Sequence, residues 1–181
     1  VGSQNDFVSQ LGERLGGEAE EDVFGALGLP WISPLLRENR GEVEAAREGR
    51  LPKLLTLEDI RGDLQMHSTW SDGANSMLEM AEACRDRGYE YLSLTDHSQS
   101  VTVARGLTPD RVRNQWLEAE EVRETLEGIH LFRSLEVDIL KDGTLDMPEE
   151  ILKGLDVVLV SVHTFMNMTK VEMTDRVIRA M

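Results

Sequence analysis

Three histidines occupy the same kind of position, at the end of an apolar, β-branched run that is typical of a buried strand. They are His67 in GDLQMHSTWSDG, His97 in SLTDHS and His163 in VVLVSVH, and the chain contains only four histidines. A carboxylate, Glu136, lies within a fourth run of this kind, SLEVDIL. Imidazoles and a carboxylate at the carboxyl ends of neighbouring strands are the ligands that a multi-metal hydrolytic site requires. These residues therefore predict metal-dependent hydrolysis.

Two further residues near His67 could reach the same ions. Side chains alternate along a strand, so we expect Asp63, Gln65 and His67 to point to one face. Gln65 is the odd member, because a neutral glutamine oxygen is a poor ligand beside an imidazole. Asp72, in the loop TWSDG, is either a ligand or a turn residue before Gly73, and the sequence weights the two nearly equally.

The other polar candidates carry more than one interpretation. A charge such as Glu136 is costly to bury unless it is paired or bound to metal, and a glutamate can bridge two cations about 3.5–4 Å apart. Asp96 either ligates an ion or orients an imidazole from behind. We interpret Asp138 as structural and His130 as unrelated to the site. Arg105 is a candidate for phosphate binding, although a solvated arginine is the more general role.

From Ile60 onward, strand and helix signals alternate regularly. We expect strands at residues 62–67, 89–95, 129–139 and 157–162. We expect a helix at residues 75–87, opened by the capping-box pattern Ser76-x-x-Glu79, and one at residues 108–128, opened by Thr108 followed by Pro109. A brief helix from Pro148 and a final one opened by Thr169-x-x-Glu172 follow. Nearly continuous apolar strands that alternate with helices predict an α/β fold with a parallel sheet covered by helices. Barrel enzymes of this class keep their chemistry at the carboxyl ends of the strands.

Composition limits the function further. The net charge of −15 argues against nonspecific nucleic-acid binding, although bound cations could offset it for a phosphate-bearing substrate. The lone Cys84 suits a reducing compartment, so we expect a cytoplasmic protein. No stretch approaches the roughly 20 apolar residues that cross a bilayer, and the start VGSQNDFVSQ does not resemble a secretory signal. We therefore expect no membrane partner.

Four strings together resemble a known family: GDLxxHSxWSDG, GYEYLSLTDHS, EVDILKDGTLD and DVVLVSVH. They are similar to the PHP (polymerase and histidinol phosphatase) domain, and more narrowly to the C-terminal PHP domain of bacterial family X DNA polymerases. The resemblance implies a distorted (β/α)7 barrel, a metal-dependent phosphoesterase activity and up to three divalent ions, Mn or Zn. The positions that match the family's metal ligands are His67, Asp72, His97, Glu136 and His163.

The resemblance also implies roles for single residues. Glu136 and His67 would act in catalysis through the metal. Gln65 stands where most PHP domains carry the first histidine of a His-x-His pair, so this ligand is expected to be weak or lost.

The first 60 or so residues extend the resemblance to the segment that joins polymerase and PHP domains. The expected organisation is a remnant of the polymerase thumb region at residues 1–19, a helical linker arm at residues 20–59 and a PHP domain at residues 60–181. The chain ends before the stretch where the family keeps a further histidine and an Asp-x-His pair, and about four of seven strands are present. We therefore interpret the sequence as part of a longer protein.

The leading hypothesis is the 3′–5′ exonuclease module of a family X DNA polymerase that acts in DNA repair. It implies DNA 3′ ends as substrate, a polymerase domain in cis and Mg for that domain. One alternative is a small-molecule phosphatase of the histidinol-phosphate type, which leaves the arm before Ile60 without a role. The other is a degenerate PHP domain with a structural or regulatory role, which Gln65 motivates.

Overall fold

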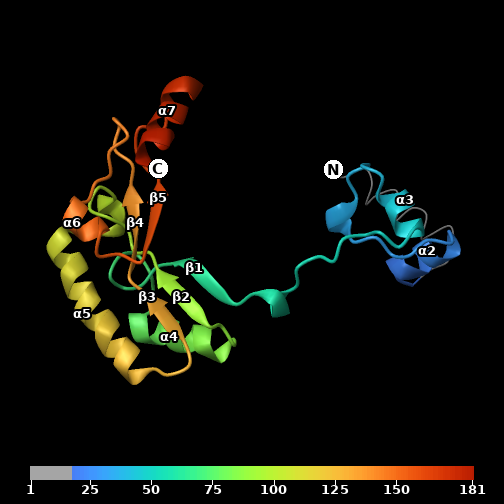
Figure 1. Cartoon of the computed structure of the whole chain (residues 1–181), viewed down its shortest axis with the longest axis horizontal. Coiled ribbons are helices and arrows are strands. Elements are labelled where there is room, and N and C mark those ends of the chain that lie inside the picture. Colours follow the sequence, from blue (N-terminus) through green and yellow to red (C-terminus); the bar gives the residue numbers. More distant parts are fainter. Residues whose placement is uncertain (1–17) are drawn as a thin grey trace. The chain divides into compact units, whose positions relative to one another are not determined.

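The computed structural model of the chain describes residues 18–181, which divide into two compact units (Figure 1). The first unit ends at Leu55, and the second spans Thr56–Met181. Of the predicted thumb remnant at residues 1–19, all but the last two residues lie outside the described range. Within that range, no helix combines the length and the apolar character that crossing a membrane would need.

The first unit consists of short helices around a small apolar cluster. Its elements are α2 (Glu20–Ala26), the 3-10 helix η1 (Pro34–Leu36) and α3 (Glu42–Arg47). The buried side chains of the cluster are Phe24, Ile32 and Ala46. The Arg37 guanidinium pairs with the Glu20 carboxylate at 2.6 Å. The first turn of α2 is acidic, with Glu20, Glu21 and Asp22.

The second unit alternates strands with helices. Its strands are β1 (Gly62–Met66), β2 (Tyr91–Leu94), β3 (His130–Phe132), β4 (Ser134–Asp138) and β5 (Val157–Ser161). Its α-helices are α4 (Met77–Asp86), α5 (Pro109–Thr125), α6 (Glu149–Leu152) and α7 (Lys170–Ala180). Two 3-10 helices, η2 (Leu57–Asp59) and η3 (Thr102–Ala104), lie in the connections. Capping boxes at Ser76 and Thr169 open α4 and α7, as their sequence signatures predict.

Every pair of neighbouring strands in the described residues is parallel. The strands β1, β2 and β3 form one sheet in that order, and β4 pairs with β5 in a second. An isolated parallel bridge between His97 and Glu136 joins the segment after β2 to β4, so the two sheets meet there. The predicted α/β class with parallel strands is confirmed.

The prediction of one strand over residues 129–139 is wrong, because the run is broken at Arg133. The backbone N–H of Arg133 donates to the Asp156 carboxylate at 2.9 Å, and the N–H of Asp156 donates to the carbonyl of Arg133 at 2.8 Å. These bonds tie the chain to the segment before β5. As a result, β3 pairs with β2 and β4 pairs with β5.

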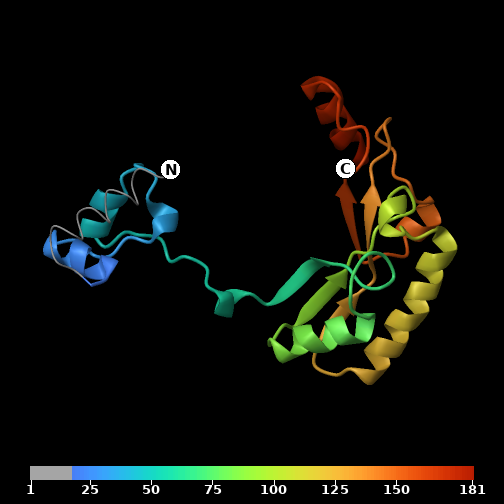
Figure 2. The ribbon, with the colours of Figure 1, turned by 180° about the vertical axis from the view of Figure 1, so that it is seen from behind.

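Apolar residues of the strands pack against the helices and leave the polar strand ends free for a site. Helices α4 and α5 cover the first sheet (Figure 2). The cluster beneath them contains Met77, Ala81, Cys84, Leu92, Leu94, Ala119, Val122, Leu126 and Leu131. A second cluster connects β4 with the start of α5 and with α6, and contains Leu107, Val112, Leu135, Val137, Met147 and Ile151. The strand ends are therefore held by packing on both sheets.

Candidate metal centre

The parallel strands bring the three predicted histidines together. His67 follows β1, His97 lies shortly beyond β2, and His163 lies shortly beyond β5. The ring of His67 stacks on that of His97 with centroids 4.5 Å apart, and His163 meets His97 edge-on at 4.9 Å. Glu136, within β4, lies among them. The carboxyl ends of separate strands therefore form one cluster, as the sequence indicated.

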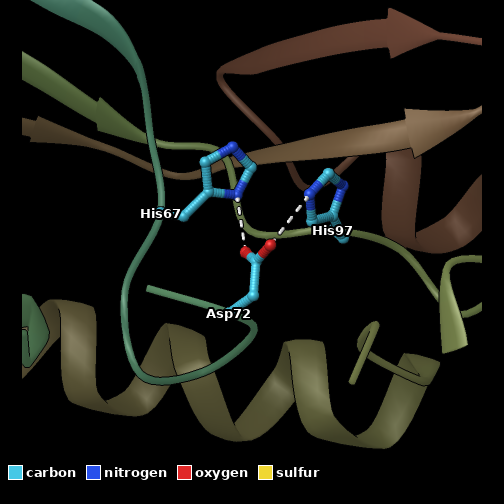
Figure 3. Close-up of side chains that lie close together, drawn as sticks. All are labelled: His67, Asp72 and His97. Carbon is cyan, nitrogen blue, oxygen red and sulfur yellow. Dashed lines mark ion pairs between the residues drawn. The ribbon is translucent and has the colours of Figure 1, made fainter. Parts of the chain in front are cut away.

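The first group of possible ligands, which we name the first triad, consists of His67, Asp72 and His97 (Figure 3). Nδ1 of His67 lies 3.6 Å from one carboxylate oxygen of Asp72, and Nε2 of His97 lies 3.8 Å from the other. One potential ligand atom from each residue lies within 4.8 Å of the others. The Asp72 side chain is 50% exposed. This triad offers two nitrogens and an oxygen to a cation that stays accessible to solvent.

Asp72 stands on the loop after β1, and a buried carboxylate fixes that loop. Asp96, with no exposed surface, accepts hydrogen bonds from the backbone and hydroxyl groups of both Ser68 and Ser71, and from the Gln115 amide. Gly73 closes the loop, since a Cβ there would lie 2.3 Å from the carbonyl oxygen of His67. Asp96 thus positions the loop that carries Asp72. Among the described residues, it makes no hydrogen bond to an imidazole.

The second triad consists of His97, Glu136 and His163. One Glu136 oxygen lies 3.2 Å from Nε2 of His163, and the other lies 3.4 Å from Nδ1 of His97. The latter oxygen is also 3.4 Å from Nε2 of His67. The Glu136 side chain is only 4% exposed. A carboxylate so deeply buried needs a compensating charge, and a cation between it and the imidazoles would supply one.

Asp138 is the residue whose role sequence reasoning missed. Its carboxylate has no exposed surface and accepts a hydrogen bond from the backbone N–H of His163 at 2.9 Å. The same oxygen lies 3.2 Å from Nδ1 of His163. Nε2 is then left to face Glu136, which is how a carboxylate behind a metal-ligating histidine sets the tautomer. The signal was available, because Glu136 and Asp138 are two residues apart and share one face of a strand.

Buried polar atoms without a hydrogen bond indicate that the cluster fits a cation. The buried side-chain atoms of the described residues that lack a hydrogen bond include Nδ1 of His67, Nδ1 of His97 and one oxygen of Glu136. Buried polar groups in folded proteins are almost always satisfied, so three such atoms in one cluster need an explanation. All three are of the types that bind Zn²⁺ or Mn²⁺. The residues present therefore fit a divalent metal.

The protonation of His97 suits the same role. Burial lowers the pKa of His97 below its ordinary value, and the neighbouring imidazoles of His67 and His163 lower it further. The carboxylates of Glu136 and Asp72 act in the opposite direction without reversing the shift. His97 is therefore held in its neutral form near pH 7, which is the form that binds a metal.

Gln65 lies on β1, two residues before His67. It is exposed, whereas His67 is partly buried. The pairing of β1 with β2 shifts register between Asp63 and Met66. That irregularity interrupts the strict alternation expected to place Gln65 beside His67. The interpretation of Gln65 as a weak or lost ligand stays a prediction.

Of the two remaining candidates, Arg105 lies beside the first triad, whereas His130 belongs to neither triad of the described residues. The Arg105 guanidinium donates to the carbonyl of Ser71, directly before Asp72, so this exposed cation lies beside the first triad. His130 opens β3, is exposed and packs on the ring of Phe132 with centroids 4.6 Å apart. In the part of the chain that the structure describes, it belongs to neither triad.

Comparison with known proteins gives two family matches. The PHP domain model matches residues 63–179, and the DNA polymerase beta thumb model matches residues 5–38. The first match contains every residue of both triads, together with Asp96, Asp138 and Arg105. The second covers the start of the chain and α2.

Curated relatives agree with these matches. The DNA polymerase/3′-5′ exonuclease PolX of Bacillus subtilis (strain 168) is 44% identical over 82% of this chain, which spans 26% of that protein. Probable phosphatases of Thermoanaerobacter sp. (strain X514) and Acetivibrio thermocellus are 31% and 33% identical, each over 56% of this chain and 40% of the relative. The chain thus spans less than half the length of these relatives. Because the PHP model covers more than half of its residues, the chain belongs to the PHP domain family.

Proposed function

We propose that the chain carries the metal-dependent phosphoesterase module of a bacterial family X DNA polymerase, acting as a 3′–5′ exonuclease in cytoplasmic DNA repair. The observation that carries the proposal is the pair of triads that share His97 at the carboxyl ends of parallel strands. The 44% identity to a relative named for both polymerase and 3′-5′ exonuclease activity supports the nucleic-acid substrate. The (β/α)7 barrel, of which these parallel strands would form part, belongs to this proposal.

The residues would divide the work as follows. His67, Asp72 and His97 would hold one cation, and Glu136 with His163 would hold a second next to it, using Mn or Zn. Up to three ions belong to the proposal, with Gln65 as the weak or missing ligand. Bound cations would supply Lewis-acid polarisation of a phosphoryl oxygen and charge neutralisation. Glu136 would keep the imidazoles oriented, and Asp138 would hold His163 in the tautomer that presents Nε2.

The substrate would approach the open side of the first triad. Asp72 is half exposed there, and the Arg105 guanidinium lies beside its loop. A guanidinium pairs well with phosphate oxygens, so we assign Arg105 to the DNA 3′ end. The thumb match at residues 5–38 supports a polymerase domain in cis, which would use Mg. The domain boundaries at residues 19 and 59 are part of the same proposal.

The test is nucleotide release from a labelled DNA 3′ end by the purified protein with Mn²⁺ or Zn²⁺. We expect release that stops when a chelator removes the metal and that Glu136→Gln abolishes. The matched control, Glu121→Gln, changes an exposed carboxylate on α5 and should leave release intact. The proposal fails if neither the wild type nor a Gln65→His variant releases nucleotides with either metal.

A small-molecule phosphatase is the second candidate, and the relatives named probable phosphatases favour it. Histidinol phosphate and single-stranded DNA, offered to the same preparation, separate the two. Faster hydrolysis of histidinol phosphate would support the phosphatase. The third reading, a degenerate domain, predicts neither hydrolysis nor stoichiometric metal. It is opposed by the fact that both triads form without Gln65.

A further inference from the structure

Phe165 has an unusual conformation for an aromatic residue close to a metal centre. It is the second residue after His163, its φ is 52°, and its side chain is 56% exposed. A bulky L-residue rarely adopts a positive φ. Such backbone strain persists only where the surrounding structure imposes it, and it concentrates at functional sites.

The loop before Phe165 is anchored on both sides. The Thr164 hydroxyl donates to the Asp138 carboxylate at 3.1 Å, and the Thr164 carbonyl accepts from the Arg176 guanidinium at 2.9 Å. Arg176 is only 2% exposed and also donates to the carbonyls of Ile139 and Leu140 at the end of β4. The position of Phe165 is therefore set by buried contacts, and its exposure is a consequence of them.

A cation stands beside the exposed ring. Nζ of Lys141, in the turn after β4, lies 5.7 Å from the centroid of the Phe165 ring. Proteins bind single-stranded nucleic acids by stacking bases on exposed aromatic rings and by contacting phosphates with cations, and Phe165 and Lys141 offer one group of each kind.

We propose that Phe165 and Lys141 form the binding site for the terminal nucleotide of a single-stranded nucleic acid, with the ring stacked on the base and the ammonium near a phosphate. The inference rests on the proposed function and adds the base contact to it. Consecutive Cα atoms are 3.8 Å apart, so the Cα atoms of Phe165 and His163 lie within about 7.6 Å. A base held on Phe165 would leave its phosphate close to the second triad.

The experiment compares two oligonucleotides, one with an ordinary 3′-terminal nucleotide and one whose terminal nucleotide lacks the base. Phe165→Ala should raise KM for the ordinary oligonucleotide by about tenfold or more, within the range measured for single stacking contacts. It should leave KM for the abasic oligonucleotide unchanged, because the stacking partner is already missing. Phe165→Trp should restore the ordinary KM, and Lys141→Gln should raise KM for both.

Met166→Ala is the matched control, since Met166 is the next residue and is 65% exposed. It should change neither KM. The stacking role would be overturned if Phe165→Ala raised KM equally for both oligonucleotides, or if Met166→Ala raised KM as much as Phe165→Ala. It would also be overturned if Phe165→Ala lowered the thermal midpoint of unfolding without changing KM, because the Phe165–Lys141 contact would then be structural only. If the wild type hydrolyses neither oligonucleotide, the proposed function fails instead.

Discussion

The two triads share His97 but hold their carboxylates in opposite ways. Asp72 stands on a loop, and its side chain is 50% exposed, whereas Glu136 stands within β4, and its side chain is 4% exposed. The histidines His67 and His163, one from each triad, are similarly exposed, at 24% and 26%. The difference between the triads therefore lies in their carboxylates, one on an exposed loop and the other buried within a strand.

Behind each triad lies a buried aspartate, and the two act at different points. Asp96 accepts hydrogen bonds from the loop that carries Asp72, whereas Asp138 contacts the candidate ligand His163 itself. Both aspartates have no exposed surface. An aspartate near a strand end can therefore support a candidate metal centre in two ways. Asp96 does so through the backbone of a loop, and Asp138 does so through the imidazole ring.

Glu136→Gln should have the largest effect, because it removes the carboxylate that faces all three histidines. We expect Mn²⁺ affinity to fall by more than about 100-fold, the upper end of the losses caused by residues behind the ligands. Isothermal titration of the purified protein with Mn²⁺ measures it, with Glu121→Gln as the control. A loss no greater than that of Asp72→Asn would contradict the asymmetry between the triads.

Asp96→Asn should destabilise the protein and disable the first triad. The amide replaces one acceptor oxygen by a donor that faces other donors, so at least one hydrogen bond to a charged group is lost. We expect the free energy of unfolding to fall by about 1.5–3 kcal/mol, measured by urea denaturation in the presence of a chelator. Asp86→Asn, whose side chain is 69% exposed at the end of α4, should change it by less than about 0.5 kcal/mol. Equal changes in the free energy of unfolding of Asp96→Asn and Asp86→Asn would refute the role of Asp96.

Asp138→Asn should weaken metal binding at the second triad. Without the carboxylate, His163 loses the partner that orients its ring, and we expect Mn²⁺ affinity to fall about 10- to 100-fold. Asp146→Asn is the matched control, since Asp146 is also a buried aspartate and lies outside both triads of the described residues. Asp138 would be merely structural if both variants lost stability alike and neither lost affinity.

Asp72→Asn should have the smallest effect of the four. Its carboxylate is half exposed, so water can take its place on a cation more easily than at Glu136. We expect a loss of Mn²⁺ affinity of about tenfold or less, at the lower end for residues that support metal sites. Asp110→Asn, with a side chain 93% exposed at the start of α5, should give no change in the same titration. A loss as large as that of Glu136→Gln would make the two triads equivalent.

Much of this fold could be predicted from local signals. The capping boxes at Ser76 and Thr169, and Thr108 followed by Pro109, placed the starts of α4, α7 and α5. Those signals work because cap side chains bond the first free N–H groups of the same helix. The break at Arg133 could not be predicted, since its cause is Asp156, which lies far along the chain.

The candidate site divides in the same way. The residue types and their places at strand ends could be predicted from the sequence, because a metal restricts the side chains that can bind it and parallel strands align their carboxyl ends. The folded arrangement shows that His97 belongs to both triads and that Asp138 contacts His163. Those outcomes depend on strand pairing, register and ring orientation, and a single sequence does not specify distances between residues that are remote along the chain.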